Sequence, residues 1–179
     1  SNYRFNQEIS VKIISPNFSL KDYNINTEEF QIKRLIKISN PEKDKTTLFI
    51  WPEGIFYQSY LEDIKKYKNL FKDKFSKKHL IILGVNNFTH QNDLVDQKYF
   101  NSLVVLDYNL EIVDLYNKIN LVPFGEFLPY EKFLSKIGLK KITPGYSSFS
   151  PGDSRTLINL GDKFNEKLIL PLICYEIIY

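Results

Sequence analysis

The sequence of 179 residues has no methionine, one cysteine, two histidines and no apolar run long enough to cross a membrane. A membrane-spanning helix requires about 20 consecutive apolar residues, so none is expected within this chain. The single cysteine, Cys174, excludes an internal disulfide. Because His79 and His90 are the only histidines of the sequence, a Cys/His zinc site is not expected either. Because methionine is missing and the last stretch, 168–179, is among the most apolar, we expect the sequence to be an excerpt of a longer chain.

Charge of neither sign dominates, since 24 Lys and Arg stand against 21 Asp and Glu, for a net charge of +3. This balance argues against nucleic acid as a partner. The lysine-rich segment 65–78 fits either an anionic lipid surface or, as we favour, a solvated helix face. Apolar residues make up 43% and aromatic residues 15% of the chain, which predicts one globular domain with a packed core.

Apolar periodicity predicts strands that alternate with helices in the first half of the chain. Strands are expected over 8–15, 47–51 and 80–85, and helices over 27–40 and 59–75. Thr27 is the expected N-cap of the first helix. The second and third strands are continuous apolar runs, as is typical of strands that are buried on both faces of a sheet.

The second half predicts a hairpin, a long loop and a final strand. Residues 102–106 and 110–115 flank the turn residues Asp107-Tyr108-Asn109. The segment 118–154 holds four prolines and four glycines, so we expect mostly loop, with at most a short helix near 131–137. A buried strand over 168–174 is expected to carry Cys174 at its end. The sequence therefore predicts an α/β layered domain with a mixed sheet.

Three polar side chains follow apolar runs, at the points where the predicted strands stop: Glu53, Lys118 and Cys174. Reacting groups of α/β folds gather at strand ends, where the sheet fixes their positions and the loops leave room for substrate. We therefore expect these three residues, which are far apart in sequence, to converge on folding.

These residue types fit acyl transfer through a thioester. Cys174 would be the nucleophile, and a partly desolvated Glu53 with a raised pKa would accept the thiol proton. The Lys118 ammonium would stabilise the oxyanion, with Glu126 or Glu176 balancing its charge. Taken singly, the cysteine also fits a core position, the glutamate a helix cap and the lysine an exposed surface, and composition and periodicity leave both interpretations open.

Three local motifs carry a resemblance to a known family. They are Trp51-Pro52-Glu53, the segment 117–126 (NKINLVPFGE) and Ile173-Cys174-Tyr175-Glu176. In their order and separation they resemble the motifs of the nitrilase domain of the apolipoprotein N-acyltransferases. The stretch 122–129 (VPFGEFLP) is the most specific of them.

The resemblance implies a nitrilase-like α-β-β-α sandwich with a mixed sheet, incomplete at its C-terminal end. Residues 1–179 would then form the N-terminal part of a nitrilase-like catalytic domain, and the membrane helices that flank this domain in the family lie outside the chain. One departure is Tyr23, which stands where the family usually has a tryptophan.

The resemblance also implies roles for individual residues. They are Cys174 as acylated nucleophile, Glu53 as general base and acid, Lys118 as oxyanion stabiliser, Glu126 as supporting carboxylate, and Tyr175 and Glu176 as substrate-binding residues that shape the acyl pocket. No metal and no organic cofactor is implied.

By this resemblance the acyl donor is a phospholipid, and the acceptor is the diacylglyceryl-cysteine at the N-terminus of a lipoprotein. The expected location is the bacterial inner membrane, with the domain on the periplasmic side. Two alternatives stay open at this point: a soluble nitrilase-superfamily amidase that acts on a small amide, and a noncatalytic domain that kept the fold. Hydrophobic segments in the flanking gene sequence would favour the acyltransferase over the amidase. An inert Cys174 thiol in the complete protein would favour the noncatalytic domain.

Overall fold

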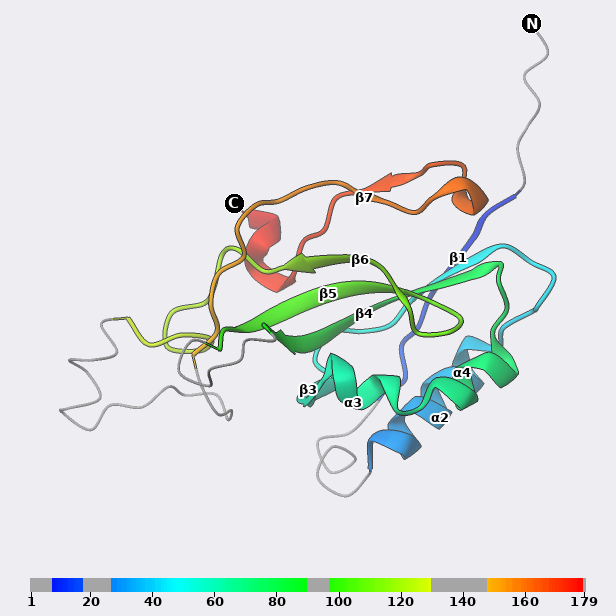
Figure 1. The fold of residues 1–179 in the computed structure, drawn as a ribbon, viewed down its shortest axis with the longest axis horizontal. Coiled ribbons are helices and arrows are strands. Elements are labelled where there is room, and N and C mark those ends of the chain that lie inside the picture. Colours follow the sequence, from blue (N-terminus) through cyan, green and yellow to red (C-terminus); the bar gives the residue numbers. More distant parts are fainter. Residues whose placement is uncertain (1–7, 18–26, 90–96, 130–147, 179) are drawn as a thin grey trace, which may run out of the picture.

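The computed structural model describes residues 8–17, 27–89, 97–129 and 148–178, and a six-stranded mixed sheet lies at its centre (Figure 1). The strands are β1 (Ser10–Ile13), β2 (Thr47–Ile50), β3 (Phe56–Tyr60), β4 (His79–Phe88), β5 (Tyr99–Asp107) and β6 (Ile112–Asn117). Their order is β1-β2-β4-β5-β6, and β3 pairs with β4 beside this path. The pairs β1–β2, β2–β4 and β3–β4 are parallel, whereas β4–β5 and β5–β6 are antiparallel.

Three helices cover one face of this sheet (Figure 1). They are α2 (Glu28–Ser39), α3 (Leu61–Lys65) and α4 (Lys68–Lys74). As predicted, Thr27 is the N-cap of α2, and its hydroxyl accepts a hydrogen bond from the Phe30 amide at 3.4 Å. The core between helices and sheet contains Ile32, Leu35, Phe49, Trp51, Phe71, Phe75, Ile81 and Leu83. Burial of these large apolar side chains is the main source of stability for this layer.

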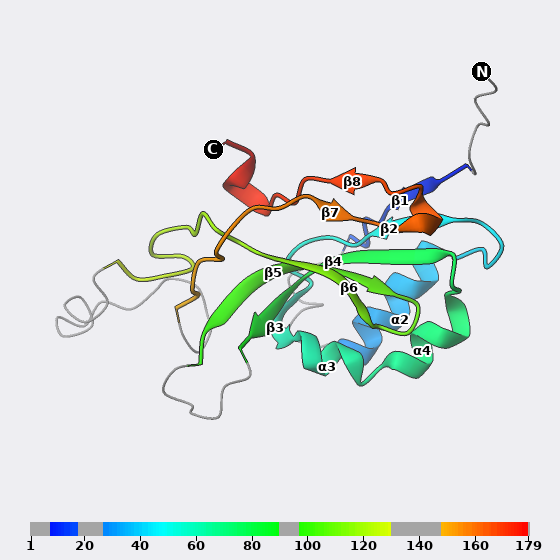
Figure 2. The ribbon, with the colours of Figure 1, turned by 45° about the horizontal axis from the view of Figure 1, so that its top comes forward.

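A smaller two-stranded sheet covers the opposite face, so the described residues form three layers (Figure 2). It pairs β7 (Ile158–Asn159) with β8 (Leu168–Ile169) in antiparallel fashion, around the short 3-10 helix η3 (Asp162–Phe164). The second core contains Leu48, Leu80, Ile82, Val105, Tyr116, Ile158, Phe164 and Ile173. Successive side chains of β2 and of β4 pack alternately into the first and the second core, so both strands are buried on two faces, as predicted. The α/β class with a mixed sheet is confirmed.

The hairpin is also confirmed. Antiparallel pairing joins β5 and β6, and the Asp107 side chain accepts hydrogen bonds from the amides of Asn109 (2.7 Å) and Glu111 (2.9 Å) across the turn. The predicted helix near 131–137 and Tyr23 lie outside the described residues. The described parts of 118–154 contain one isolated bridge, which joins Pro123 to Phe127, and no helix or strand.

The single helix predicted over 59–75 is wrong. Residues 56–60 form β3, and two separate helices, α3 and α4, follow with a break at 66–67. The strand β4 extends beyond the end of β2, so its free edge pairs with β3 through Val85 and Asn86. The Asp63 side chain then accepts a hydrogen bond from the Tyr60 amide (3.0 Å), which starts α3 one residue later. Tertiary pairing thus overrides the local helical pattern.

The buried strand predicted over 168–174 is also wrong. Only Leu168 and Ile169 pair, and Leu168 and Leu170 are 56% and 57% exposed. Pro171 has no amide hydrogen to continue the ladder. The chain therefore reaches Cys174 as an irregular segment. Within the described residues, no helix combines the length and apolar character needed to cross a membrane.

Candidate active site

Glu53, Lys118 and Glu126 lie where strands of the main sheet end, whereas Cys174 follows no strand of that sheet and is connected to this end through Glu176. Asn86 of β4 pairs with Asn101 of β5, and Ser102 pairs with Asn117 of β6, so the end of β4, the start of β5 and the end of β6 share one edge. At this edge the Lys118 amide donates to the Asn101 carbonyl oxygen at 2.8 Å. Alternating strand direction thus brings residues from distant parts of the chain to one place.

Glu53 arrives at the same edge from β2. The chain leaves β2 at Trp51, whose amide donates to the Ile82 carbonyl oxygen of β4 at 2.8 Å. Two residues later, Glu53 passes over Gly84, where a Cβ atom would lie 3.5 Å from both Cα and Cγ of Glu53. That is ordinary van der Waals contact, so the small residue leaves space beside Glu53 without being sterically required.

Lys118 and Glu126 form a buried ion pair. The Lys118 side chain is 1% exposed, and its Nζ atom lies 3.0 Å from Oε1 and 2.9 Å from Oε2 of Glu126. Glu126 is 14% exposed. A buried ammonium is stable only when it is paired and hydrogen-bonded, and Glu126 supplies that pairing. Of the two carboxylates considered from the sequence, Glu126 is therefore the one that balances Lys118.

Glu126 is itself fixed by two further donors. The Asn101 Nδ2 atom donates to Oε1 at 2.7 Å, and the Val122 amide donates to Oε2 at 2.9 Å. The backbone of Glu126 also donates to the Val122 carbonyl oxygen at 2.8 Å, which closes the turn 122–126. Asn101 was not a candidate from the sequence. The signal that could have pointed to it is a polar residue near the start of an otherwise apolar strand.

The pKa of Glu53 is raised above the ordinary glutamate range. Desolvation is the largest influence and raises the pKa, and repulsion from Glu126 raises it further. The Lys118 ammonium and a hydrogen bond with Asn101 lower it, but by less. These influences place Glu53, Lys118 and Glu126 in one charge cluster. The direction of this pKa shift agrees with the expectation from the sequence, and the role of Glu53 as general base stays a prediction.

Cys174 begins the 3-10 helix η4 (Cys174–Ile178) and is exposed. Its backbone is left-handed, with a φ of 54°, a conformation that costs about 1–2 kcal/mol for a residue with a Cβ atom. The turn closes behind it, because the Glu176 amide donates to the Ile173 carbonyl oxygen at 3.2 Å. Backbone strain of this kind persists only where the surrounding structure fixes it.

Glu176 is fully buried and links this turn to the end of β6. Its Oε2 accepts from the Ile173 amide (3.0 Å), and its Oε1 accepts from the amides of Ile119 (2.9 Å) and Asn120 (3.0 Å), directly after Lys118. Cys174 is thereby tied to the segment that carries Lys118. Figures 1 and 2 both show the C-terminal 3-10 helix beside the chain that leaves β6.

Two side chains complete the Glu176 environment. The Tyr116 hydroxyl donates to Oε1 at 2.7 Å, and Arg155 Nη2 lies 3.0 Å from the same oxygen. Desolvation would raise the pKa of Glu176, but hydrogen bonds, led by those from the Asn120 and Ile173 amides, outweigh it and hold the pKa below its ordinary value. Sequence reasoning missed Tyr116 and Arg155, since neither belongs to a motif.

Tyr175 and Glu176 point to different environments. Tyr175 is 60% exposed, next to the exposed Ile177 and Ile178, whereas the Glu176 carboxylate contacts protein donors only. Substrate contact by either residue stays a prediction. The Glu176 carboxylate joins the turn at Cys174 to the end of β6.

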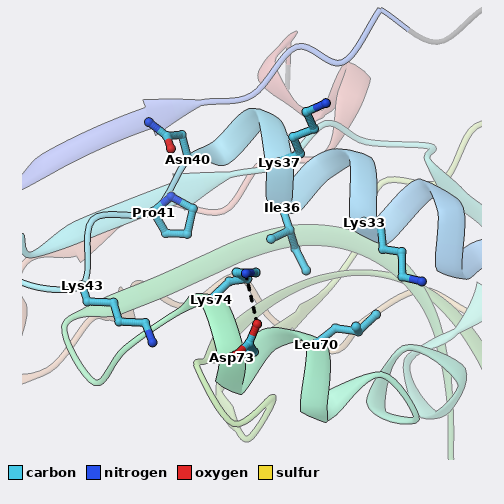
Figure 3. Close-up of a pocket in the computed structure, with 9 residues that line it drawn as sticks. All are labelled: Lys33, Ile36, Lys37, Asn40, Pro41, Lys43, Leu70, Asp73 and Lys74. Carbon is cyan, nitrogen blue, oxygen red and sulfur yellow. Dashed lines mark ion pairs between the residues drawn. The ribbon is translucent and has the colours of Figure 1, made fainter.

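A pocket of about 630 Å³ lies elsewhere, between α2, α4 and the loop that follows α2 (Figure 3). Four lysines and one aspartate line it beside apolar residues: Lys33, Lys37, Lys43, Lys74, Asp73, Ile36, Leu70, Asn40 and Pro41. None of the residues predicted to react is among them. The candidate residues at the sheet edge therefore lie outside this pocket.

The described residues thus combine a mixed α/β fold with a glutamate and a buried lysine–glutamate pair at one end of the main sheet, and an exposed cysteine joined to that end through Glu176. No family model matches the chain. The chain is, however, homologous to curated apolipoprotein N-acyltransferases. It is 26% identical over 178 residues to the one from Allorhizobium ampelinum, with 97% of this chain and 33% of the relative covered.

Two further apolipoprotein N-acyltransferases are similar to shorter parts of the chain. The one from Rhizobium rhizogenes is 31% identical over 132 residues, covering 74% of this chain and 24% of that protein. The one from Caulobacter vibrioides is 32% identical over 138 residues, covering 74% and 25%. The chain thus spans between 24% and 33% of the length of these relatives.

Among solved structures, a carbon-nitrogen hydrolase from Helicobacter pylori G27 is similar with a TM-score of 0.43 and 16% identity, covering 81% of this chain and 45% of that one. An N-terminal amidase in complex with an Asn-Glu-Ala peptide has a TM-score of 0.39 and 14% identity, covering 63% and 28%. Both likenesses are weak.

Proposed function

We propose that the chain carries the catalytic core of an N-acyltransferase that moves an acyl chain from a phospholipid to the N-terminal diacylglyceryl-cysteine of a lipoprotein. The observation that carries the proposal is the buried Lys118–Glu126 pair, held at 2.9 and 3.0 Å beside Glu53, with Cys174 tied to the same end of β6. The naming of the homologous relatives supports the substrate class.

In the first half-reaction, the Glu53 carboxylate accepts the thiol proton of Cys174 as the sulfur attacks the ester carbonyl of the phospholipid. A C–S bond forms, and the carbonyl oxygen becomes an oxyanion that the Lys118 ammonium stabilises. Collapse of this intermediate breaks the C–O bond. Glu53 then gives its proton to the leaving alkoxide, which departs as a lysophospholipid, and Cys174 is left as a thioester.

In the second half-reaction, the neutral α-amino group of the diacylglyceryl-cysteine attacks the thioester carbonyl. Glu53 accepts a proton from the amine, and Lys118 again stabilises the oxyanion. The C–S bond breaks, an amide forms, and Glu53 returns the proton to the sulfur. A carboxylate with a raised pKa suits both directions, because it accepts and releases protons nearer neutral pH.

Glu126 supports both steps without touching the reacting atoms. Its two oxygens hold the Lys118 Nζ atom, and its own orientation is fixed by Asn101 and Val122. The ammonium is thus held in position before the oxyanion forms, so little reorganisation is needed during the reaction.

Apolar side chains follow the nucleophile directly. Tyr175, Ile177 and Ile178 are 60%, 74% and 71% exposed in the 3-10 helix that Cys174 begins. Of these, Tyr175 directly follows Cys174, and we place it at the border of the acyl pocket. We place the enzyme at the bacterial inner membrane with this domain on the periplasmic side, held there by segments outside the chain.

The test uses the complete gene product with a phospholipid that carries a labelled acyl chain and a synthetic diacylglyceryl-cysteinyl peptide. We expect the label on the peptide α-amino group, with loss of transfer in Cys174→Ser. The pocket variant Lys37→Ala, remote from the sheet edge, is the control and should transfer normally. Hydrolysis of small amides without acyl transfer would instead support an amidase.

A further inference from the structure

Residues 148–155, which we call the strap, cross the end of β6 and bond to the catalytic segments through the backbone. The Phe149 amide donates to the Glu126 carbonyl oxygen at 2.8 Å, and the Gly152 amide donates to the Lys118 carbonyl oxygen at 2.9 Å. Between them, the Ser150 amide donates to the Tyr99 carbonyl oxygen at 2.7 Å. The strap thus fixes the backbone of both members of the buried ion pair.

Gly152 shows how closely the strap lies on β6. A Cβ atom at this position would stand 2.2 Å from the carbonyl oxygen and 2.9 Å from the carbonyl carbon of Asn117. Because the contact is with backbone, no side-chain rotation relieves it. Only glycine lets the strap approach this closely.

Arg155 ends the strap and points toward the Glu176 carboxylate. Its Nε atom donates to the Tyr116 hydroxyl at 3.3 Å and its Nη2 atom to Glu176 Oε1 at 3.0 Å, while the guanidinium carbon lies 6.0 Å from the centre of the Tyr116 ring. The Arg155 side chain is 24% exposed and that of Glu176 is fully buried. One guanidinium thereby connects the strap, β6 and the turn at Cys174.

We propose that Arg155 is a positioning residue for the acylation of Cys174, an inference that rests on the proposed function. Glu176 bonds on one side to the Ile173 amide, directly before the nucleophile, and on the other to the Ile119 and Asn120 amides, directly after Lys118. Arg155 donates to Oε1, the oxygen that also accepts from the Ile119 and Asn120 amides. Without it, the carboxylate loses its cationic partner and the distance between nucleophile and oxyanion stabiliser is less well defined.

The test measures the rate of thioester formation on Cys174 against phospholipid concentration in the complete gene product and its variants. Arg155→Met is expected to lower the maximum acylation rate per folded molecule by about 10- to 100-fold, as misplacement of about 1 Å does. The concentration at half-saturation should stay unchanged, because Arg155 does not touch substrate. Arg155→Lys should recover part of the rate, since an ammonium reaches one of the two acceptors.

The matched control is Arg34→Met. Arg34 is also partly buried and donates from Nη2 to the Pro16 carbonyl oxygen at 3.0 Å, but on the helix layer. It should change stability without changing the acylation rate per folded molecule. A wild-type rate in folded Arg155→Met, or no difference between the Met and Lys variants, would overturn the inference.

Two further outcomes are decisive. If Arg155→Met fails to fold, the Lys variant alone decides: a reduced acylation rate at unchanged half-saturation supports the positioning role, and a wild-type rate refutes it. If the wild-type protein itself forms no thioester, the proposed function is wrong and this inference is wrong with it.

Discussion

A double substitution at the buried ion pair separates its structural role from its catalytic role. The variants are Lys118→Met, Glu126→Gln and the two combined. In Lys118→Met, the Glu126 carboxylate loses its cation but keeps the donors Asn101 Nδ2 and the Val122 amide. In Glu126→Gln, an ammonium that is 1% exposed keeps only an amide oxygen as acceptor.

Removing one partner of a buried ion pair costs about 3–5 kcal/mol. We expect Lys118→Met near the lower end of this range, because two donors still satisfy Glu126. The double variant leaves no unpaired charge and only imperfect hydrogen bonding, so it should be about 2 kcal/mol less stable than wild type. It should therefore be more stable than either single variant.

Activity should not recover with stability. Loss of one oxyanion donor lowers the rate by about 100- to 1,000-fold, and both variants that lack Lys118 should show this. The assays are guanidinium denaturation for the free energy of unfolding and thioester formation for the rate. Additive losses of stability would refute the buried pair, and acyl transfer by the double variant would refute the role of Lys118.

Three more predictions follow from the geometry of the site. Gly152→Ala should slow acylation and lower the free energy of unfolding by about 1–3 kcal/mol, because its Cβ would meet the Asn117 carbonyl oxygen at 2.2 Å. The control is Gly161→Ala, whose Cβ meets nothing within 4 Å and which should change stability alone. Equal acylation rates in the two folded variants would contradict the prediction. The kcat/KM for acylation should fall as the pH drops through the raised pKa of Glu53, since only the carboxylate accepts the thiol proton; a pH profile with its acidic limb in the ordinary glutamate range would argue against this role. The pKa of Glu176 is lower in the folded state than in the unfolded state, so its ionised carboxylate stabilises the fold above the unfolded-state pKa, and this stabilisation is lost as the pH falls through the folded-state pKa. The difference in unfolding free energy between wild type and Glu176→Gln should therefore shrink from about pH 7 to pH 3. A difference that stays constant with pH would refute this prediction.

The parts of the fold that follow from local pattern could be predicted from the sequence. The strands β2 and β4 are continuous apolar runs, because alternate residues enter cores on both faces of the sheet. The start of α2 follows from Thr27 and its hydroxyl. By contrast, β3 exists because it pairs with the protruding part of β4, and β8 is short because Pro171 interrupts pairing. These outcomes depend on neighbours that no local window contains.

The candidate site divides in the same way. Glu53 and Lys118 are found because each follows an apolar run, and the structure places both at one sheet edge with Glu126. Asn101 and Arg155 are not found, because their importance comes from partners far away in sequence. In the sequence, Arg155 is one charge in a segment rich in proline and glycine, and nothing local distinguishes it from a solvated surface residue.

The most direct measurement of the central claim is the mass of the complete gene product after incubation with phospholipid alone. The account predicts one added acyl chain, located on Cys174 by peptide mapping, removed by hydroxylamine and absent in Cys174→Ser. An unmodified Cys174 in a folded protein that still transfers acyl chains to the lipopeptide would contradict it.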